Sequence, residues 1–451
     1  MKTTNTFICL GAFILIQSAG LAQGVPNYID TYVGNGSITV NKIAGSTNQI
    51  YSPTDLDFHP TFANMELWVI NRSTENLGGN TVTIYDAGEP TQTSVYKKDD
   101  NSWHFMSLPT GIAFSENGNW ANSTGVYDAN HNGGAAFTGP ALWSSDMAVY
   151  AQPSGGNGSH LDMLHLSPYC QGIAAEVDNI FWVFDGYTND IVRYDFGGDH
   201  GPGGADHDNG KVRRYSDDAV AKDPNNEIVS HLELDANAQW LYVVDHGNQR
   251  VIRIDITTGS NLGGTPNYPS PETLAEYAEY TGYTQETVVS GLSKPAGIDI
   301  VENRMIVSEY ESGEIIIYDI STMPAVELDR IASGYNTVQG VTIGPKGYIW
   351  FVDESSRGVY RVEVPNLEVN ELTASANFTL FPNPSSGDVQ LNVKNKIDAT
   401  IEVRDLQGKL VTVETISGQT LTMNLNVLPG MYFVTMIADE FNSVTQRLVI
   451  K

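Results

Sequence analysis

The sequence predicts an all-β protein, a six-bladed β-propeller followed by a small C-terminal immunoglobulin-like β-sandwich. Three observations lead to this prediction. A pattern of short apolar strands and polar turns recurs six times between residues 52 and 364. Charged residues make up only 17% of the chain while glycine and tyrosine are abundant, which is typical of a turn-rich β protein and not of a disordered acidic one. After residue 366, alternating apolar residues and evenly spaced turns predict a separate small sandwich of roughly seven strands.

The six copies share a short strand, a turn, a second strand ending in a polar residue, another turn and a third strand. The copies begin SPTDLDF at 52, LPTGIAF at 108, SPYCQGIAA at 167, VSHLELD at 229, KPAGIDI at 294 and VQGVTIG at 338. A sheet of three or four strands cannot bury both faces alone, whereas six sheets stacked around an axis cover one another. The copies therefore predict a closed ring of sheets.

Segments outside the copies also carry structural predictions. Residues 36–45, GSITVNKIAG, are expected to form a strand that completes the last sheet and closes the ring. Residues 141–152 and 211–217 are expected to supply outer strands. The insertion ETLAEYAEY at 272–280 is expected to form a short helix. At the ends of the second strands, Asp residues recur at 185, 245 and 353, which predicts that their carboxylates cap turn amides between neighbouring sheets.

The N-terminus predicts export. Lys2 precedes an apolar run over residues 7–16, and small residues at 19–22 offer a cleavage site. This pattern is typical of a secretory signal peptide, here residues 1–23, and the apolar run is too short for a membrane-spanning helix. Its removal leaves Cys170 as the one cysteine, which excludes a disulfide within the chain and predicts a buried thiol.

The charge balance restricts the class of partner. The formal net charge is −29, from 24 basic and 53 acidic residues. Such a surface repels phosphate groups, so nucleic acid and anionic membranes are excluded as partners. No later stretch is apolar enough to be a membrane-spanning segment. Cations and neutral extracellular molecules remain as candidate ligands.

The C-terminal segment carries the most specific motifs. Residues 367–376 have the composition of a polar linker, and residues 377–451 follow as a domain. The motifs are Pro382-Asn383-Pro384-Ser385 with Gly387, Asp405 with Gly408-Lys409, Leu428-Pro429-Gly430-Met431-Tyr432 and the terminal Lys451. Together they resemble the type A C-terminal sorting domain of the bacterial type IX secretion system. The resemblance implies a Gram-negative cell, recognition of residues 377–451 by the type IX secretion machinery, and secretion or attachment to the outer cell surface.

The six copies resemble the NHL-type six-bladed β-propeller over roughly residues 30–365, and we assign residues 24–366 to this domain. The third copy, FDGYTNDIVRYDF, also resembles a blade of peptidylglycine amidating lyase, a zinc-dependent propeller enzyme. That resemblance implies catalytic roles for Tyr187 and Arg72. The chain departs from the lyase pattern at Thr110 and Gln339, where two zinc-binding histidines would fall, and this puts the metal and the reaction in doubt.

Two groups of residues are candidates for binding. Aligned strand starts place the larger polar residues Gln171, His231 and Gln339 at one mouth of the channel, as a ligand-binding ring. The loop DHGPGGADHDNG at 199–210 and the preceding insertion bring further metal ligands. These are His160, His165, His200, His207, Asp199, Asp206 and Asp208.

Three interpretations of this second group stay open. The aspartates and carbonyl groups of the loop are suited to Ca²⁺. A transition metal such as Zn²⁺ is suited to His160 or His165 acting together with His200 or His207. A loop that is ordered without metal is the third interpretation.

The sequence thus favours an exported or cell-surface propeller that binds an extracellular small molecule, peptide or glycan at the channel mouth. The aromatic residues of the insertion at 117–169 suit a carbohydrate, although they equally suit packing against a β-surface. The alternative is a metal-dependent propeller lyase or hydrolase.

Overall fold

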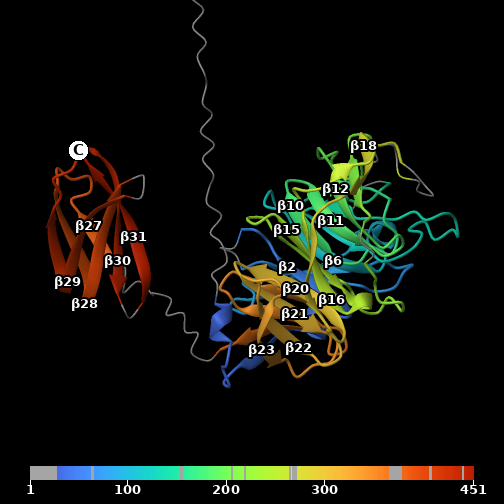
Figure 1. Cartoon of the computed structure of the whole chain (residues 1–451), viewed down its shortest axis with the longest axis horizontal. Coiled ribbons are helices and arrows are strands. Elements are labelled where there is room, and N and C mark those ends of the chain that lie inside the picture. Colours follow the sequence, from blue (N-terminus) through green and yellow to red (C-terminus); the bar gives the residue numbers. More distant parts are fainter. Residues whose placement is uncertain are drawn as a thin grey trace, which may run out of the picture. The chain divides into compact units, whose positions relative to one another are not determined.

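The computed structural model describes residues 28–61, 65–152, 156–204, 207–217, 220–263, 266, 272–364, 378–405, 409–438 and 441–451. The predicted signal peptide at 1–23, the predicted linker at 367–376 and Asp206 lie outside these residues. Nearly all regular structure in the described residues is β-strand (Figure 1). The chain divides into two compact units between Val364 and Pro365.

In the described residues of the N-terminal unit, the strands form six sheets. The first contains β2 Pro53–Phe58, β3 Leu67–Asn71, β4 Asn80–Tyr85 and β5 Thr93–Lys97, and the second β6 Pro109–Phe114, β7 Asn119–Thr124, β8 Ala141–Ser144 and β9 Asp162–Met163. The third begins with β10 Ile173–Val177, β11 Ile180–Asp185, β12 Asp190–Asp195 and β13 Lys211–Tyr215, and the fourth contains β14 Leu232–Asp235, β15 Trp240–Asp245, β16 Arg250–Asp255 and β19 Gln285–Ser290. The fifth contains β20 Pro295–Val301, β21 Arg304–Glu309, β22 Glu314–Asp319 and β23 Val326–Ala332, and the sixth β24 Val338–Ile343, β25 Ile349–Asp353 and β26 Gly358–Glu363 together with β1 Thr39–Ala44.

The first strands of these sheets contact one another in a cycle. β2 lies against β6, β6 against β10, β10 against β14, β14 against β20, β20 against β24, and β24 against β2. β1 pairs antiparallel with β26, from Thr39 opposite Glu363 to Ala44 opposite Val359. The prediction that residues 36–45 complete the last sheet is therefore confirmed, and the start of the unit is hydrogen bonded to its end.

The core lies between neighbouring sheets and is rich in aromatic rings. Trp68 of β3, Trp120 of β7, Trp143 of β8 and Tyr150 are fully buried in one cluster between the first and second sheets. Trp120 and Trp143 stack with ring centroids 5.7 Å apart. Each such ring contributes roughly 1.5–3 kcal/mol or more by leaving water. Trp120, Trp143 and Tyr150 therefore pack against the β-surface, and none of these three rings is exposed to a sugar.

The expectation of a helix at 272–280 is wrong. Residues Glu276–Thr281 form strand β18, which pairs in parallel with β13 and antiparallel with the short β17 Ser260–Asn261. The third sheet therefore runs β10-β11-β12-β13-β18-β17. The free edge of β13 offers a ladder of backbone hydrogen bonds, and Tyr277 packs against the core there. This tertiary gain overrides the helix propensity of Glu and Ala.

The C-terminal unit is a single sheet of five strands in its described residues, and not a sandwich of seven. The strands are β27 Phe378–Phe381, β28 Asp388–Asp405, β29 Leu410–Asn424, β30 Gly430–Ala438 and β31 Phe441–Ile450. A bridge between Ser385 and Ile450 joins its ends into a nearly closed, barrel-like sheet. The register shifts between Asn392 and Ile397 of β28, and such a bulge bends the strand. One long bent strand thus stands where the turn spacing predicted two.

Candidate metal centre

The insertions beside the second and third sheets line an open cavity of about 330 Å³. Four imidazoles line it together with aromatic and amide side chains. His104 lies on the short helix α1 Ser102–Phe105, between β5 and β6. His160 and His165 flank β9, and His207 lies in the loop between β12 and β13. Loops from two neighbouring sheets therefore bring together histidines that are up to about a hundred residues apart in the sequence.

Each of the four rings is held through its Nδ1 atom by an oxygen. The partners are the carbonyl of Ala129 for His104 (3.0 Å), the carbonyl of Asn157 for His160 (2.9 Å), Glu272 Oε1 for His165 (2.6 Å) and Asp162 Oδ1 for His207 (2.9 Å). Carbonyl and carboxylate oxygens accept hydrogen bonds, so each Nδ1 carries a proton and donates it. This is the arrangement that orients histidines as metal ligands through Nε2.

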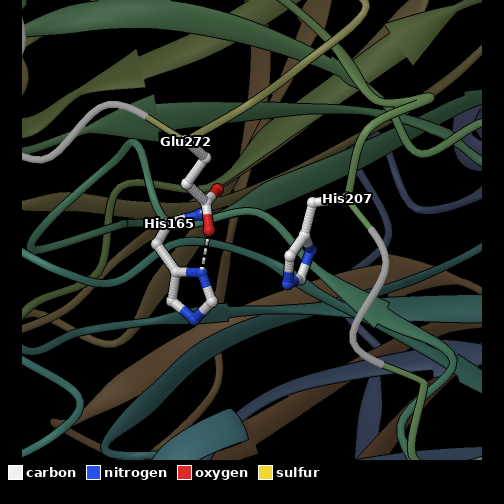
Figure 2. A group of neighbouring side chains, drawn as sticks. All are labelled: His165, His207 and Glu272. Atoms are coloured by element: carbon white, nitrogen blue, oxygen red, sulfur yellow. Dashed lines mark hydrogen bonds and ion pairs between the residues drawn. The ribbon is translucent and has the colours of Figure 1, made fainter.

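The Nε2 atoms of His104 and His165 lie 3.3 Å apart. Two lone pairs at this distance repel each other unless a proton or a cation lies between them. One ligand atom from each of His165, His207 and Glu272 lies within 4.8 Å of the others. Figure 2 shows the His165–Glu272 contact, with the His207 ring facing this pair from a different loop. The centroids of the His165 and His207 rings are 5.7 Å apart.

Glu272 acts here as the group that positions His165. Its Oε1 accepts from Nδ1 of His165, and its Oε2 accepts from the backbone N–H of the same residue at 2.7 Å. Burial raises the pKa of Glu272, but the hydrogen bonds and charge of His165 outweigh burial and lower it below its usual value. Glu272 is therefore a carboxylate that orients the ring, and each of its oxygens has a second lone pair for a metal ion.

Burial keeps two of the other imidazoles neutral. Burial and the nearby His165 together lower the pKa of His104 to about 4. Burial likewise lowers the pKa of His160 to about 4, and this ring stacks on Phe105 with centroids 3.6 Å apart. A neutral imidazole is the form that binds metal, so at neutral pH no proton has to be displaced from these rings.

The predicted metal ligands separate into two sets. His160, His165 and His207 line the histidine cavity, whereas Nε2 of His200 contacts Asn209 Oδ1 at 3.0 Å within its own loop. Oδ1 of Asp199 accepts from the N–H of Gly201 at 2.6 Å, as in an ordinary turn. Asp208 is exposed. Across the described ranges, the group of His165, His207 and Glu272 is the one set of three with metal-ligand spacing, and it contains no loop aspartate.

The three residues predicted to form a ligand-binding ring are all buried, at 4% exposure or less. Gln171 accepts from Ser230 N–H at 3.4 Å and donates to the carbonyl of Tyr169 at 3.0 Å. Gln339 accepts from Val229 N–H at 3.1 Å and donates to the carbonyl of Glu227 at 2.8 Å. The two amide groups thus bind the segment 227–230 of the chain itself.

The predicted catalytic residues contact different neighbours. Arg72 donates to the carbonyl of Asn226 at 2.5 Å, and burial lowers its pKa. Tyr187 is 42% exposed and meets Tyr127 edge to face, with centroids 5.4 Å apart. A hydrogen bond to Tyr127 raises the pKa of Tyr187. Neither residue belongs to the set that lines the histidine cavity.

The recurring aspartates cap backbone amides as predicted, but the partners of Asp185 and Asp353 belong to their own sheets and not to a neighbouring one. Asp185 Oδ1 accepts from the N–H groups of Tyr187 and Thr188, and Asp353 accepts from those of Thr337 and Ser356. Asp245 Oδ1 accepts from the N–H of Ala221, which precedes the fourth sheet. Asp353 and Asp245 each join the segment before the first strand of their sheet to the end of its second strand.

Sequence reasoning missed His104, Asp162 and Glu272. His104 lies before the second copy, at a distance from the cluster of histidines in the third and fourth copies. Glu272 lies 107 residues after His165 and belongs to the insertion that was expected to be helical. No local pattern links Glu272 to His165, because Glu272 lies just before β18, which pairs with the edge strand β13.

Comparison with known proteins identifies the C-terminal unit. Residues 379–451 match the family model of the secretion system C-terminal sorting domain. The C-terminal unit carries a sorting domain of this kind. The sorting domain indicates export and cell-surface attachment by the type IX system of Bacteroidetes, and it implies contact with the secretion machinery. No helix in the described residues is long and apolar enough to cross a membrane. No curated protein matches the sequence.

Comparison with solved structures finds matches of low sequence identity. Two auxiliary nutrient binding proteins are among them, from Bacteroides thetaiotaomicron (10% identity, TM-score 0.47) and Bacteroides ovatus (11%, 0.45). In both cases 72% of this chain and 76% of the other is covered. PorZ, a surface component of the type-IX secretion system of Porphyromonas gingivalis, is 10% identical with a TM-score of 0.37, covering 88% of this chain and 51% of PorZ. Similarity at this level carries no argument about ligand or activity.

Proposed function

We propose that the protein is an exported surface protein whose NHL-like six-bladed β-propeller, residues 24–366, binds a transition-metal ion in the histidine cavity. The observation that carries this proposal is the group of His165, His207 and Glu272 with metal-ligand spacing, in a cavity lined by four imidazoles that are each anchored through Nδ1. The sorting domain, residues 377–451, directs the propeller out of the cell through the type IX machinery. Processing of a signal peptide at 1–23 and the linker at 367–376 complete the proposed organisation.

The propeller assignment is supported by the six sheets, by the cycle of contacts between first strands, and by β1 pairing with β26. Propellers commonly close by adding a strand from one end of the chain to the sheet at the other end. In this arrangement the segment 226–230 lies across the ring, because Arg72 of the first sheet and Gln339 of the sixth both bind it. We therefore propose that the ligand binds at the histidine cavity and not at the channel mouth formed by Gln171, His231 and Gln339.

The donor set favours Zn²⁺ among transition metals. His165, His207 and Glu272 supply two nitrogen ligands and one oxygen ligand, with ligand atoms within 4.8 Å of one another. His104 and His160 line the same cavity. Zinc with two imidazole ligands and one carboxylate ligand keeps a fourth position for water or a ligand group. Trp103 and Phe137 form apolar walls beside this position, and Asn101 and Asn130 offer amide groups. The site is thus suited to a small extracellular ligand with one metal-binding polar group, and zinc-activated water is the route by which it would act as a lyase or hydrolase.

Metal content tests this proposal. We expect the protein, loaded with Zn²⁺ and dialysed, to hold one ion per chain by inductively coupled plasma mass spectrometry. His165→Ala removes a ligand and abolishes stoichiometric binding. Glu272→Gln weakens the orientation of His165 and lowers the affinity about 10–100-fold. His200→Ala is the matched control, because this ring lies in the neighbouring loop and contacts Asn209.

Retention of a full equivalent of zinc by folded His165→Ala would contradict the proposal. Loss of zinc in His200→Ala alone would move the site to the glycine-rich loop. Stoichiometric Ca²⁺ with no zinc would support the alternative in which the loop aspartates bind calcium.

A further inference from the structure

A second, acid-lined cavity lies among the first strands of the N-terminal unit. Its outer part has a volume of about 280 Å³ and its inner part about 40 Å³, and the two share lining residues. The shared set includes Asp57 of β2, Glu233 of β14, Asp299 of β20 and Thr342 of β24. Asp55 lines the inner part only. Four carboxyl groups from three sheets thus face one enclosed space.

The only basic side chain among the described residues that line this acid-lined cavity is His231. Its residue is 4% exposed, and its Nδ1 lies 3.3 Å from Asp55 Oδ2. Its Nε2 is buried and has no hydrogen-bond partner within the described part of the chain. An Nδ1–H that donates to Asp55 leaves Nε2 as an acceptor, so a ligand at this point has to donate a hydrogen bond.

Three of the carboxylates already have a structural role. Asp55 Oδ2 accepts from Ile112 N–H on β6 at 2.9 Å. Asp57 accepts from Phe58 N–H at 2.7 Å and, across to β6, from Phe114 N–H at 2.8 Å. Asp299 accepts from the N–H of Ile343 at 2.5 Å and from the hydroxyl of Thr342 at 3.0 Å, both on β24. These aspartates join first strands of neighbouring sheets. The backbone hydrogen bond of Glu233 is with Leu234 on its own strand, so this carboxyl joins no neighbouring sheet through it.

The spacing of the carboxyl groups excludes a single bare metal ion held by three of them. Ligand atoms around one divalent ion lie within about 5 Å of one another. In the described residues, the histidine group alone has three ligand atoms within 4.8 Å, and the acid-lined set does not. A larger cation, whose donors reach separate carboxylates, fits this spacing better. Phe58 and Phe114 line the outer part and suit methylene groups or the face of an ammonium ion.

We propose that the acid-lined cavity binds a small organic ammonium ion, a primary amine or diamine, with its N–H groups donated to Glu233, Asp57 and Asp299. His231 Nε2 accepts from the end of the ligand that reaches the inner part. This site is separate from the histidine cavity and does not depend on metal binding.

Burial raises the pKa values of three carboxyl groups in the acid-lined cavity. Burial raises the pKa of Asp57 to about 8 and that of Asp299 to about 6, and it raises the pKa of Glu233 as well. Asp55 and His231 are the further titratable groups that face this space. An ammonium ion favours the ionised carboxylates, so its binding releases protons and strengthens as pH rises.

Calorimetry with 1,4-diaminobutane tests the proposal on the full chain. We expect saturable one-to-one binding at pH 8, and affinity at least about tenfold weaker at pH 6, where Asp57 is largely protonated and Asp299 about half protonated. The uncharged isostere 1,4-butanediol does not bind. Glu233→Gln, which leaves the bridging aspartates in place, weakens binding at least about tenfold. Glu311→Gln removes the same charge from an exposed pair with Lys294 and leaves binding unchanged.

Equal affinity of Glu233→Gln and wild type, with both shown folded by circular dichroism, would overturn the proposal. Binding of Ca²⁺ or Mg²⁺ without any binding of the diamine would also overturn it and assign a hydrated metal ion instead. The same titration on His165→Ala separates the two sites, because this variant loses zinc but has to keep diamine binding.

Discussion

At the residue scale, the third sheet depends on one buried cation. The residue Arg214 on β13 is 5% exposed, and its Nη1 lies 2.8 Å from Asp185 Oδ2 and 3.0 Å from Asp190 Oδ2. Its Nη2 donates to the carbonyl of Leu166 at 2.6 Å. The guanidinium thus joins the capping carboxylate of Asp185 to the segment that leads from His165 into β10. The ion pair and the histidine cavity are thus connected through two adjacent residues, Leu166 and His165.

Replacing this cation leaves a buried carboxylate without its partner. We expect Arg214→Met to lower the free energy of unfolding by about 3–5 kcal/mol, measured by urea denaturation. Arg214→Met combined with Asp185→Asn recovers part of this loss, because the uncompensated charge is removed. Arg330→Met, in an exposed pair with Glu327, is the control and costs about 1 kcal/mol or less. A loss in Arg214→Met no larger than the control would show that the buried pair contributes little.

At the element scale, neighbouring first strands are tied together by side chains instead of a continuous backbone ladder. Asp57 on β2 reaches the backbone of β6, and Asp299 on β20 reaches that of β24. Small residues permit this close approach: a Cβ on Gly340 of β24 would lie 2.2 Å from Asp55 Oδ1. The same carboxylates line the acid-lined cavity, so the elements that form the ring also set its charge.

This arrangement predicts a pH dependence of stability. The pKa of Asp57 is about 8 in the folded chain, against about 3.9 in an unfolded one. Between these values the folded state binds more protons than the unfolded state, so stability contributed by this group falls as pH rises from about 4 to about 8. We expect the melting temperature without added cations to decrease over this window. Asp57→Asn should flatten the decrease, and an unchanged slope in that variant would assign the titration to another group.

At the scale of the whole N-terminal unit, closure depends on residues that lie before the first copy. β1 supplies one edge strand of the sixth sheet, and the buried hydroxyl of Tyr32 donates to the carbonyl of Val362 at 3.0 Å. Deleting residues 28–45 leaves β26 as an exposed edge and removes this pairing. Since each sheet is covered by its neighbours, the loss is transmitted to the core between the sixth and first sheets.

We expect the deletion of residues 28–45 to lower the melting temperature by on the order of 10 °C and to broaden the transition. Differential scanning calorimetry measures both quantities. Thr39→Ala, which keeps the backbone pairing with Glu363, serves as the control and should melt like the wild type. A deletion variant that melts at the wild-type temperature would show that closure is independent of β1.

The sequence by itself determined the features that depend on local pattern. Repeated strand starts located the first strands, alternating residues marked the closing strand, and motifs such as Pro382 to Ser385 identified the sorting domain. Local turn chemistry likewise predicted the role of Asp185. These features are encoded within a few residues of chain, where spacing and side-chain type fix the geometry.

Only the tertiary structure decided which distant side chains meet. It grouped His165 with His207 and added His104 and Glu272, which no pattern linked to them. It turned residues 276–281 into a strand because the free edge of β13 offers hydrogen bonds there. It also buried Gln171 and Gln339 against the chain's own backbone, whereas strand alignment had assigned them to a ligand. Sites of this kind arise from contacts between loops and sheets far apart in sequence, and their energies depend on packing that local residue pattern does not encode.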